Sequence, residues 1–151
     1  MLAPPLQGAA ALTHDVLRGV CRMLLAQGHS PVPELTLPTG RRLDVAALSP
    51  QGAIIAVEIK VSVGDFQGDQ KWGEYLDFCD EFYFAVPESF PIEMLPDAHG
   101  LIVADRFGGA TLRPSPVSQV QTARRKAMTL RIARAAAERW HRGFDPDFRG
   151  Y

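Results

Sequence analysis

The chain has 151 residues, enough for one domain that buries about two thirds of its unfolded surface without a disulfide or a structural metal. Hydrophobic residues make up 46% and charged residues 22%, a balance that excludes an extended disordered chain. The net charge of -1 hides an asymmetry, because residues 1–110 hold seven basic and fourteen acidic side chains, whereas residues 111–151 hold nine and three. This pattern fits either a phosphate-binding surface beside an acidic site or a solvated basic helix.

The compartment is suggested by what the sequence lacks. Cys21 and Cys79 form no CxxC pair and are expected to be reduced structural thiols. No apolar run approaches the roughly 20 residues that span a membrane, and the N-terminus has no basic segment of the kind that opens a signal peptide. A cytoplasmic protein with no membrane contact is therefore expected.

The first half of the chain predicts a helix followed by three strands. Apolar residues recur at helical spacing over residues 9–27, and two prolines then interrupt residues 30–34. Turn-forming residues separate the runs that follow, so consecutive strands should pair as antiparallel neighbours. The expected strands are Glu34–Leu37, Arg42–Leu48 and Ala53–Val61.

The second half predicts a helix, three strands and a long final helix. Residues 64–78 should be a loop that leads into a helix from about Asp69. The remaining expected elements are strands at Phe82–Val86, Leu101–Ala104 and Ala110–Arg113, a hairpin turn at Gly108-Gly109 and a helix over Gln119–His141. A single domain over residues 1–151 is expected, with flexible ends at 1–8 and 145–151.

Two charged side chains stand in the otherwise apolar strand Ala53–Val61. Alternation along a strand places Glu58 and Lys60 on the same face. Asp44 interrupts the preceding strand, and pairing across the turn at 49–52 places residue 44 opposite residue 58, with Cβ atoms about 5 Å apart if both face one side. Buried charges are costly unless they are paired or bound to a metal.

Two such carboxylates repel each other unless one is protonated or a cation lies between them. Hard oxygen ligands favour Mg²⁺ or Mn²⁺, which can polarise a phosphate and lower the pKa of a bound water. Lys60 could then orient that water or stabilise charge on the phosphate. The alternative is a buried ion network in which Lys60 simply neutralises Asp44 or Glu58.

With Asp44 and Glu58-Ile59-Lys60 on successive strands, the order of elements resembles the PD-(D/E)xK nuclease superfamily and its restriction-endonuclease-like core. A narrower resemblance, to the MmcB-like DNA repair proteins, covers residues 17–141. It is carried by VPELTLPTGRRLDVAAL, AVEIKVSVGDFQGDQKWGEYLDFCDEFYFAVP, GLIVAD and the basic start of the last helix at 122–127.

The resemblance implies an α/β fold with a mixed central sheet flanked by helices, and a role in DNA repair. It also implies roles for individual residues. Asp44 and Glu58 become metal ligands, the backbone carbonyl of Ile59 a further ligand, and Lys60 the catalytic lysine. Leu43 stands where the superfamily pattern has proline. A glutamate that many members carry on the first helix has no counterpart there except Asp15, so Glu34 is the favoured candidate for a further metal ligand, with an ordinary surface residue as the alternative.

Several residues around this site are candidate DNA contacts. Lys71 and Tyr75 are four apart on the expected helix, where they should share a face, and they resemble the Gln-x-x-x-Tyr pair of related nucleases. Arg41 and Arg42 precede the Asp44 strand and could contact phosphates, or simply be solvated. Trp72 could stack on a base or, as we favour, pack in the core.

The final helix has a basic face and an apolar face. The basic candidates for DNA contact are Arg124, Arg131, Arg134 and Arg142, and the residues expected to dock on the sheet are Leu130, Ala133, Ala137 and Trp140. A basic face kept only for solubility is the alternative. The four histidines are dispersed, which makes a zinc site improbable.

Three functions are consistent with the sequence. The first is a Mg²⁺- or Mn²⁺-dependent deoxyribonuclease in DNA repair, with Asp44, Glu58 and Lys60 as its catalytic residues. The second is an inactive or partner-dependent DNA-binding accessory module, and the third is a structural protein with a buried ion network. The expected partner is DNA, and further repair proteins or a second copy of the chain are possible partners.

Overall fold

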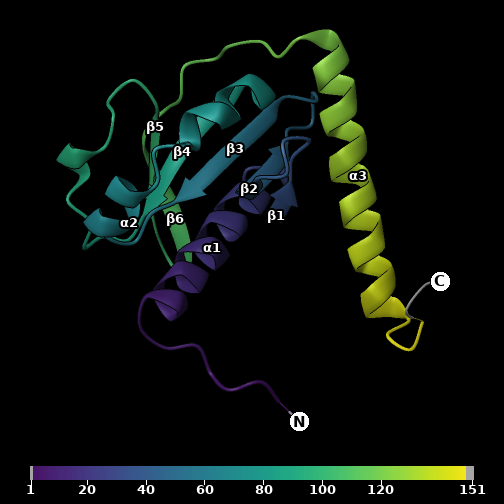
Figure 1. Ribbon diagram of the computed structural model, residues 1–151, viewed down its shortest axis with the longest axis horizontal. Helices are drawn as coiled ribbons and strands as arrows, with labels where there is room; N and C mark the ends of the chain where they lie inside the picture. Colours follow the sequence, from purple (N-terminus) through teal and green to yellow (C-terminus); the bar gives the residue numbers. More distant parts are fainter. Residues whose placement is uncertain (1, 149–151) are drawn as a thin grey trace.

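Six strands form one sheet in the computed structural model, which describes residues 2–148 (Figure 1). The rest of the chain, including the end of the tail expected to be flexible, lies outside the described residues. The helices are α1 (Gly8–Ala26), α2 (Val63–Gly68) and α3 (Thr122–Phe144), with short 3-10 helices η1 (Trp72–Phe78) and η2 (Ile92–Met94). The strands are β1 (Ser30–Thr36), β2 (Arg42–Leu48), β3 (Ile54–Ile59), β4 (Glu81–Val86), β5 (Gly100–Asp105) and β6 (Gly108–Arg113).

The sheet keeps the strands in chain order and is mixed, as expected. Strands β1, β2 and β3 pair antiparallel, β3, β4 and β5 pair parallel, and β6 returns antiparallel to β5. All six residues of β3 are buried, as is typical of a central strand covered on both faces. The charged residues at the end of β3 are therefore largely shielded from water.

Helices cover both faces of the sheet. Helix α1 packs its stripe of Val16, Val20, Met23 and Leu24 on one face, against apolar residues of β2 to β5. The other face is covered by α3, η1 and the chain around α2, where Met128, Ile132 and Tyr75 enter the second apolar cluster. Among residues 2–148, no helix has the length and apolar character needed to cross a bilayer.

The close fit of α1 on the sheet depends on Gly19. A Cβ atom on this residue would lie 1.8 Å from the carbonyl oxygen of Asp105 and 2.6 Å from that of Gly108. Real atoms do not approach so closely, so α1 can cross the β5–β6 turn only where a side chain is absent. This contact brings the two ends of the sheet under one helix.

Strand β1 begins earlier than the sequence predicted. It starts at Ser30 and includes Pro31 and Pro33, the residues that were expected to break the chain. Proline cannot donate to a ladder, but β1 is an edge strand with only one neighbour, so the missing N–H groups can face outward. The prolines therefore mark the edge of the sheet rather than a loop.

Two local predictions in the middle of the chain are wrong. No α-helix starts at Asp69, because α2 ends at Gly68 and the segment after it forms the 3-10 helix η1. The hairpin turn lies at residues 106–107, and Gly108 and Gly109 open β6 instead. Asp105 accepts hydrogen bonds from the backbone N–H groups of Phe107 and Gly108, which closes the turn one residue pair earlier than the glycine pattern suggested.

Helix α3 starts three residues later than predicted and docks through a different face. Met128 and Ile132 are buried against the sheet, whereas Leu130 and Trp140 are 54% and 67% exposed. The predicted apolar stripe thus faces away from the sheet. Tertiary anchors decide the rotation of the helix, because the buried carboxylate of Asp80 binds the guanidinium of Arg125 on the docked side, with Nη1 to Oδ2 at 2.7 Å.

Candidate functional site

The side chains of strand β2 change the face of the sheet on which they lie at Asp44. Leu43 packs in the cluster on the α3 side of the sheet, yet Val45, two residues later, packs in the cluster on the α1 side. The ladder to β1 is interrupted at the same level, between the pairs Pro33–Val45 and Leu35–Leu43. An irregularity of this kind changes the direction in which a nearby side chain points. Here the carboxylate of Asp44 points toward β3.

Asp44 and Glu58 are direct neighbours across β2 and β3. The register pairs Val45 with Val57, so the next pair outward is residue 44 with residue 58, as the sequence predicted. The backbone N–H of Asp44 donates to Oε1 of Glu58 at 3.1 Å, and the N–H of Ile59 donates to Oδ2 of Asp44 at 2.8 Å. Each carboxylate is therefore held by a backbone N–H group of the neighbouring strand.

Burial makes this pair of acids reluctant to ionise fully. Glu58 is only 4% exposed. Burial, followed by the negative charge of Asp44, raises the pKa of Glu58 to about 9. Burial also raises the pKa of Asp44, although the hydrogen bond from Ile59 and the charge of Lys60 act in the opposite direction. A proton on Glu58 relieves the repulsion between the two carboxylates when no cation lies between them.

Lys60 lies beside this pair and is 3% exposed. Its Nζ atom is 3.9 Å from Oε2 of Glu58, so the two side chains share a face as alternation predicted. A shorter contact joins Nζ to Oδ2 of Asp69, at 2.7 Å. Burial raises the pKa of Asp69, but the hydrogen bonds from Lys60 and from the backbone N–H of Lys71, together with the charges of Lys60 and Arg41, outweigh it, so the pKa is lowered overall.

Asp69 is the member of the site that sequence reasoning left without a role. Its signal was weak but present, because Asp65 and Asp69 are the two acidic residues in the crossover between β3 and η1. Asp65 serves the helix start, where its N–H bonds the Ser62 side chain. Asp69 instead reaches back to Lys60, which anchors the ammonium beside the acids.

The donor set fits a small divalent cation that keeps several waters. Within residues 2–148, no group of three or more His, Cys, Asp or Glu side chains is placed to hold an ion. Asp44 and Glu58 would thus be the carboxylate ligands, with the remaining positions left to water, substrate or a backbone carbonyl such as that of Ile59. Mg²⁺ is bound in this way, through one or two carboxylates and its own waters.

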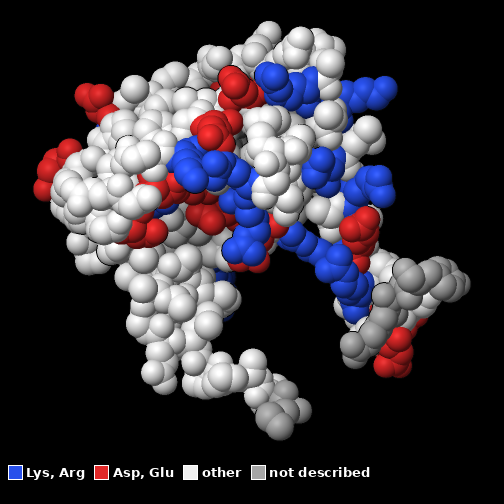
Figure 2. Space-filling model, in the orientation of Figure 1, with Lys and Arg blue, Asp and Glu red and all other residues white. Residues whose placement is uncertain are grey.

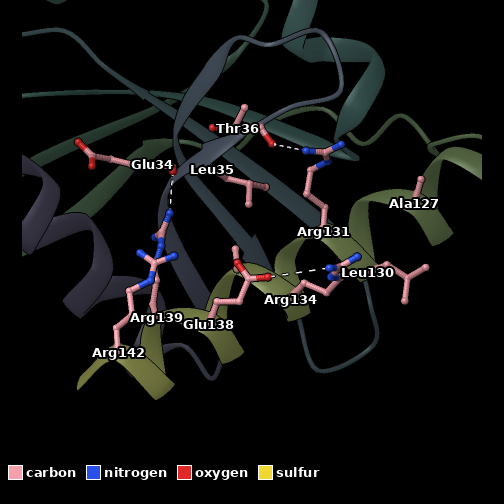
Figure 3. Close-up of a pocket in the computed structure, with 11 residues that line it drawn as sticks. Glu34, Leu35, Thr36, Ala127, Leu130, Arg131, Arg134, Glu138, Arg139 and Arg142 are labelled. Atoms are coloured by element: carbon pink, nitrogen blue, oxygen red, sulfur yellow. Dashed lines mark hydrogen bonds and ion pairs between the residues drawn. The ribbon is translucent and has the colours of Figure 1, made fainter. Parts of the chain in front are cut away.

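Glu34 lies in the same row of the sheet but turns away. It is the residue at the interruption of β1 opposite Asp44, and its φ of 52° lies in the left-handed region. Its exposed carboxylate is 3.9 Å from the guanidinium of Arg42, and Figure 3 shows it pointing away from α3. Its role as a further metal ligand stays a prediction.

Of the predicted DNA contacts next to the site, some are exposed and others are buried in contacts that support the fold. Lys71 is exposed, but Tyr75 is buried and its hydroxyl donates to the carbonyl of Arg42 at 3.3 Å. The two do not share an exposed face, because η1 is a 3-10 helix in which residues four apart are turned apart. Burial, with the nearby charges of Glu58 and Asp69, raises the pKa of Tyr75 to about 12.

The arginines and Trp72 around this region also have protein partners. Arg41 pairs with Glu74, and Arg42, exposed, faces Glu34. Trp72 stacks on Phe82 at a ring distance of 5.9 Å and meets other core rings edge-on, as the core interpretation predicted. Arg42 is therefore the more available of the two arginines for a phosphate.

Two of the four α3 arginines that were predicted to contact DNA also hold the helix in place. Arg124 lies over the ring of Phe78 at 5.3 Å and donates to the carbonyl of Asp77. Arg131 donates to the carbonyl of Thr36 at 3.1 Å. Carbonyl partners leave the positive charge of a guanidinium uncompensated, so both arginines could still attract an anion.

Comparisons with known proteins give a family and a related solved structure. The family model described as DNA repair protein MmcB-like matches residues 6–147. The chain belongs to the MmcB-like family. Among solved structures, the MmcB-like chain is similar to the SPO1766 protein of unknown function from Silicibacter pomeroyi, at 39% identity and a TM-score of 0.89, covering 91% of this chain and 94% of that one. No curated protein matches.

Membership in the MmcB-like family supports a role in DNA repair, which the sequence resemblance had implied. The agreement with the solved structure extends over nearly the whole sheet and its helices, so the fold that positions Asp44, Glu58 and Lys60 is shared.

Proposed function

We propose that this MmcB-like protein is a divalent-cation-dependent phosphodiesterase that acts on DNA during repair. The observation that carries the proposal is the pairing of two desolvated carboxylates, Asp44 and Glu58, with the buried ammonium of Lys60 3.9 Å from one of them. A cation bound there would polarise a phosphate oxygen and make a bound water more acidic.

The residues of the chain have distinct parts in this chemistry. Asp44 and Glu58 would hold the cation, and Glu58 would release its proton on binding, because a metal-bound carboxylate must be ionised. Lys60 keeps its ammonium directed at the same place through its bond to Asp69. From there it would orient the attacking water or neutralise charge that develops on the phosphate.

A nuclease assay with isosteric variants tests the proposal. Labelled single-stranded, duplex and branched DNA would be incubated with Mg²⁺ or Mn²⁺ and with wild type, Asp44→Asn or Lys60→Gln. We expect wild type to cleave at least one substrate, and each variant to lose activity by about 100-fold or more. The exposed residue Asp97 supplies a control, Asp97→Asn, that should cleave like wild type.

Persistent cleavage in a purified Asp44→Asn/Lys60→Gln double variant would reject the proposal. Circular dichroism and thermal unfolding would establish that the variants are folded.

One observation favours a second function, that of a DNA-binding accessory module. Lys60 is already held by Asp69, and no third acidic ligand joins Asp44 and Glu58 among the residues that the structure describes. A centre of this kind could depend on a partner protein for activity or lack turnover. Salt-sensitive DNA binding without strand scission under any divalent ion would support this second function.

A further inference from the structure

A groove of about 470 Å³ runs between α3 and the edge strand β1 (Figure 3). Its charged lining consists of Arg131, Arg134, Arg139, Arg142, Glu34 and Glu138. Figure 2 shows basic side chains along α3, beside the hollow between this helix and the rest of the molecule. The groove is thus the place where the basic C-terminal part of the chain faces the sheet.

Two of these arginines hold the walls of the groove together. Arg139 donates to the carbonyls of Pro33 and Glu34, the second at 2.8 Å, and Arg131 donates to that of Thr36. These partners are neutral, so both guanidinium groups keep their full charge. These hydrogen bonds also hold the C-terminal half of α3 beside β1, so the groove is already formed before a ligand binds.

The other two arginines are free to bind a ligand. The side chain of Arg134 is 79% exposed, and its contact with Glu138 is 4.0 Å long, a surface pair of small energy. Arg142 is exposed as well. The carboxylate of Glu34 points away, so four cations in the groove face a single carboxylate, that of Glu138. Charge complementarity therefore favours a polyanion.

The outer face of α3 excludes one way of binding DNA. A helix that enters the major groove of a duplex needs polar and basic side chains on its outward face. Here that face carries apolar residues, namely Ala133, Ala137, Trp140 and Phe144. Arg131 and Arg139 reach β1 instead, and Arg134 and Arg142 line the same space, which is bounded by one helix and one strand. A single extended strand fits such a space better than a duplex.

The groove lies beside the strands that carry the carboxylate pair, although neither Asp44 nor Glu58 lines it. Arg139 holds the backbone of Glu34, which lies opposite Asp44, and Asp44 in turn lies opposite Glu58. Neighbouring strands are about 4.8 Å apart, so the wall of the groove is about 10 Å from Glu58 along this row. A backbone held in the groove would pass within reach of the candidate site.

We propose that the groove between α3 and β1 binds the sugar-phosphate backbone of a single DNA strand, with Arg134 and Arg142 as its phosphate contacts. The identity of the ligand as DNA rests on the proposed function. Arg131 and Arg139 add positive charge and keep the groove open. Glu138 opposes the ligand and weakens its binding.

Binding of a labelled oligodeoxythymidylate, followed by fluorescence anisotropy in EDTA at several salt concentrations, tests this proposal without any cleavage. The test variant is Arg134→Ala/Arg142→Ala. The control Arg106→Ala/Lys126→Ala removes the same charge at two exposed positions outside the groove. We expect the test variant to lose about tenfold or more in affinity and about 1.4 units of salt slope, since each single-strand phosphate contact contributes about 0.7.

Further comparisons sharpen the outcome. Glu138→Gln should bind more tightly than wild type, and the single strand should bind more tightly than a duplex of equal length. Equal losses in the test and control variants, no loss in either, or a preference for duplex would overturn the proposal. A wild-type protein that binds the single strand but cleaves no DNA would reject the phosphodiesterase and leave the groove proposal intact.

Discussion

Glu58 couples the ionisation of the candidate site to folding. Its pKa is raised to about 9 in the folded chain, from an ordinary value of 4.5. Between these values the folded state holds a proton that the unfolded state has released. Stability must therefore fall as the pH rises through this range, because ionisation of Glu58 favours the unfolded chain.

Without divalent cations, we expect the free energy of unfolding to decrease from about pH 5 to about pH 9. Glu58→Gln should flatten this decrease, because the amide resembles the protonated acid and cannot ionise. Urea unfolding in EDTA at several pH values measures the effect, with the exposed variant Glu93→Gln as control. A pH profile unchanged by Glu58→Gln would show that Glu58 ionises normally in the folded protein.

At the scale of the elements, α1 and α3 are positioned by different physical means. Helix α1 lies so close to the sheet that Gly19 touches the β5–β6 turn. Helix α3 depends on polar anchors, since Asp80 accepts hydrogen bonds from the backbone of Ile54 and Val120 as well as from Arg125. Close packing places the first helix, and a buried carboxylate places the last.

Gly19→Ala should destabilise the protein by about 2 kcal/mol or more, because the new methyl group overlaps the carbonyl of Asp105. Gly143→Ala is the matched control in α3, where a Cβ would meet nothing within 4 Å. That change should leave stability unchanged or raise it by about 0.5 kcal/mol. Chemical denaturation of both variants measures the difference, and equal stabilities would contradict the close packing of α1.

At the scale of the whole molecule, the proposed DNA binding and the proposed chemistry belong to separate places. The groove lies between α3 and the edge of the sheet, and Asp44 and Glu58 lie one and two strands further in. A homodimer remains a prediction. The exposed apolar face of α3 is a surface whose partner nothing in the structure identifies.

Because the groove and the carboxylates lie apart, variants at the two places should change different kinetic parameters. For a DNA strand that wild type cleaves, Arg134→Ala/Arg142→Ala should raise KM by about tenfold with kcat little changed, because the groove binds ground state and transition state alike. Lys60→Gln should lower kcat and leave DNA affinity near that of wild type. Steady-state kinetics together with anisotropy measure both. A fall in kcat in the groove variant would show that the groove contributes to the chemical step.

The sequence by itself determined the order of the strands, the helices at the two ends of the chain and the register of the carboxylate pair. These follow from local physics, since apolar periodicity distinguishes helix from strand, and a short turn forces residues 44 and 58 to meet. The family resemblance, confirmed over residues 6–147, rests on the same stretches of sequence.

Only the tertiary structure decided which face of α3 docks, that Lys71 and Tyr75 separate, and that Asp69 holds Lys60. In α3, both an apolar stripe and a stripe with arginines could face the sheet. The choice was made by Met128, Ile132 and the bond from Arg125 to a distant aspartate. Such contacts join residues far apart in the chain, so no local pattern could reveal them, and the groove between α3 and β1 exists only because they form.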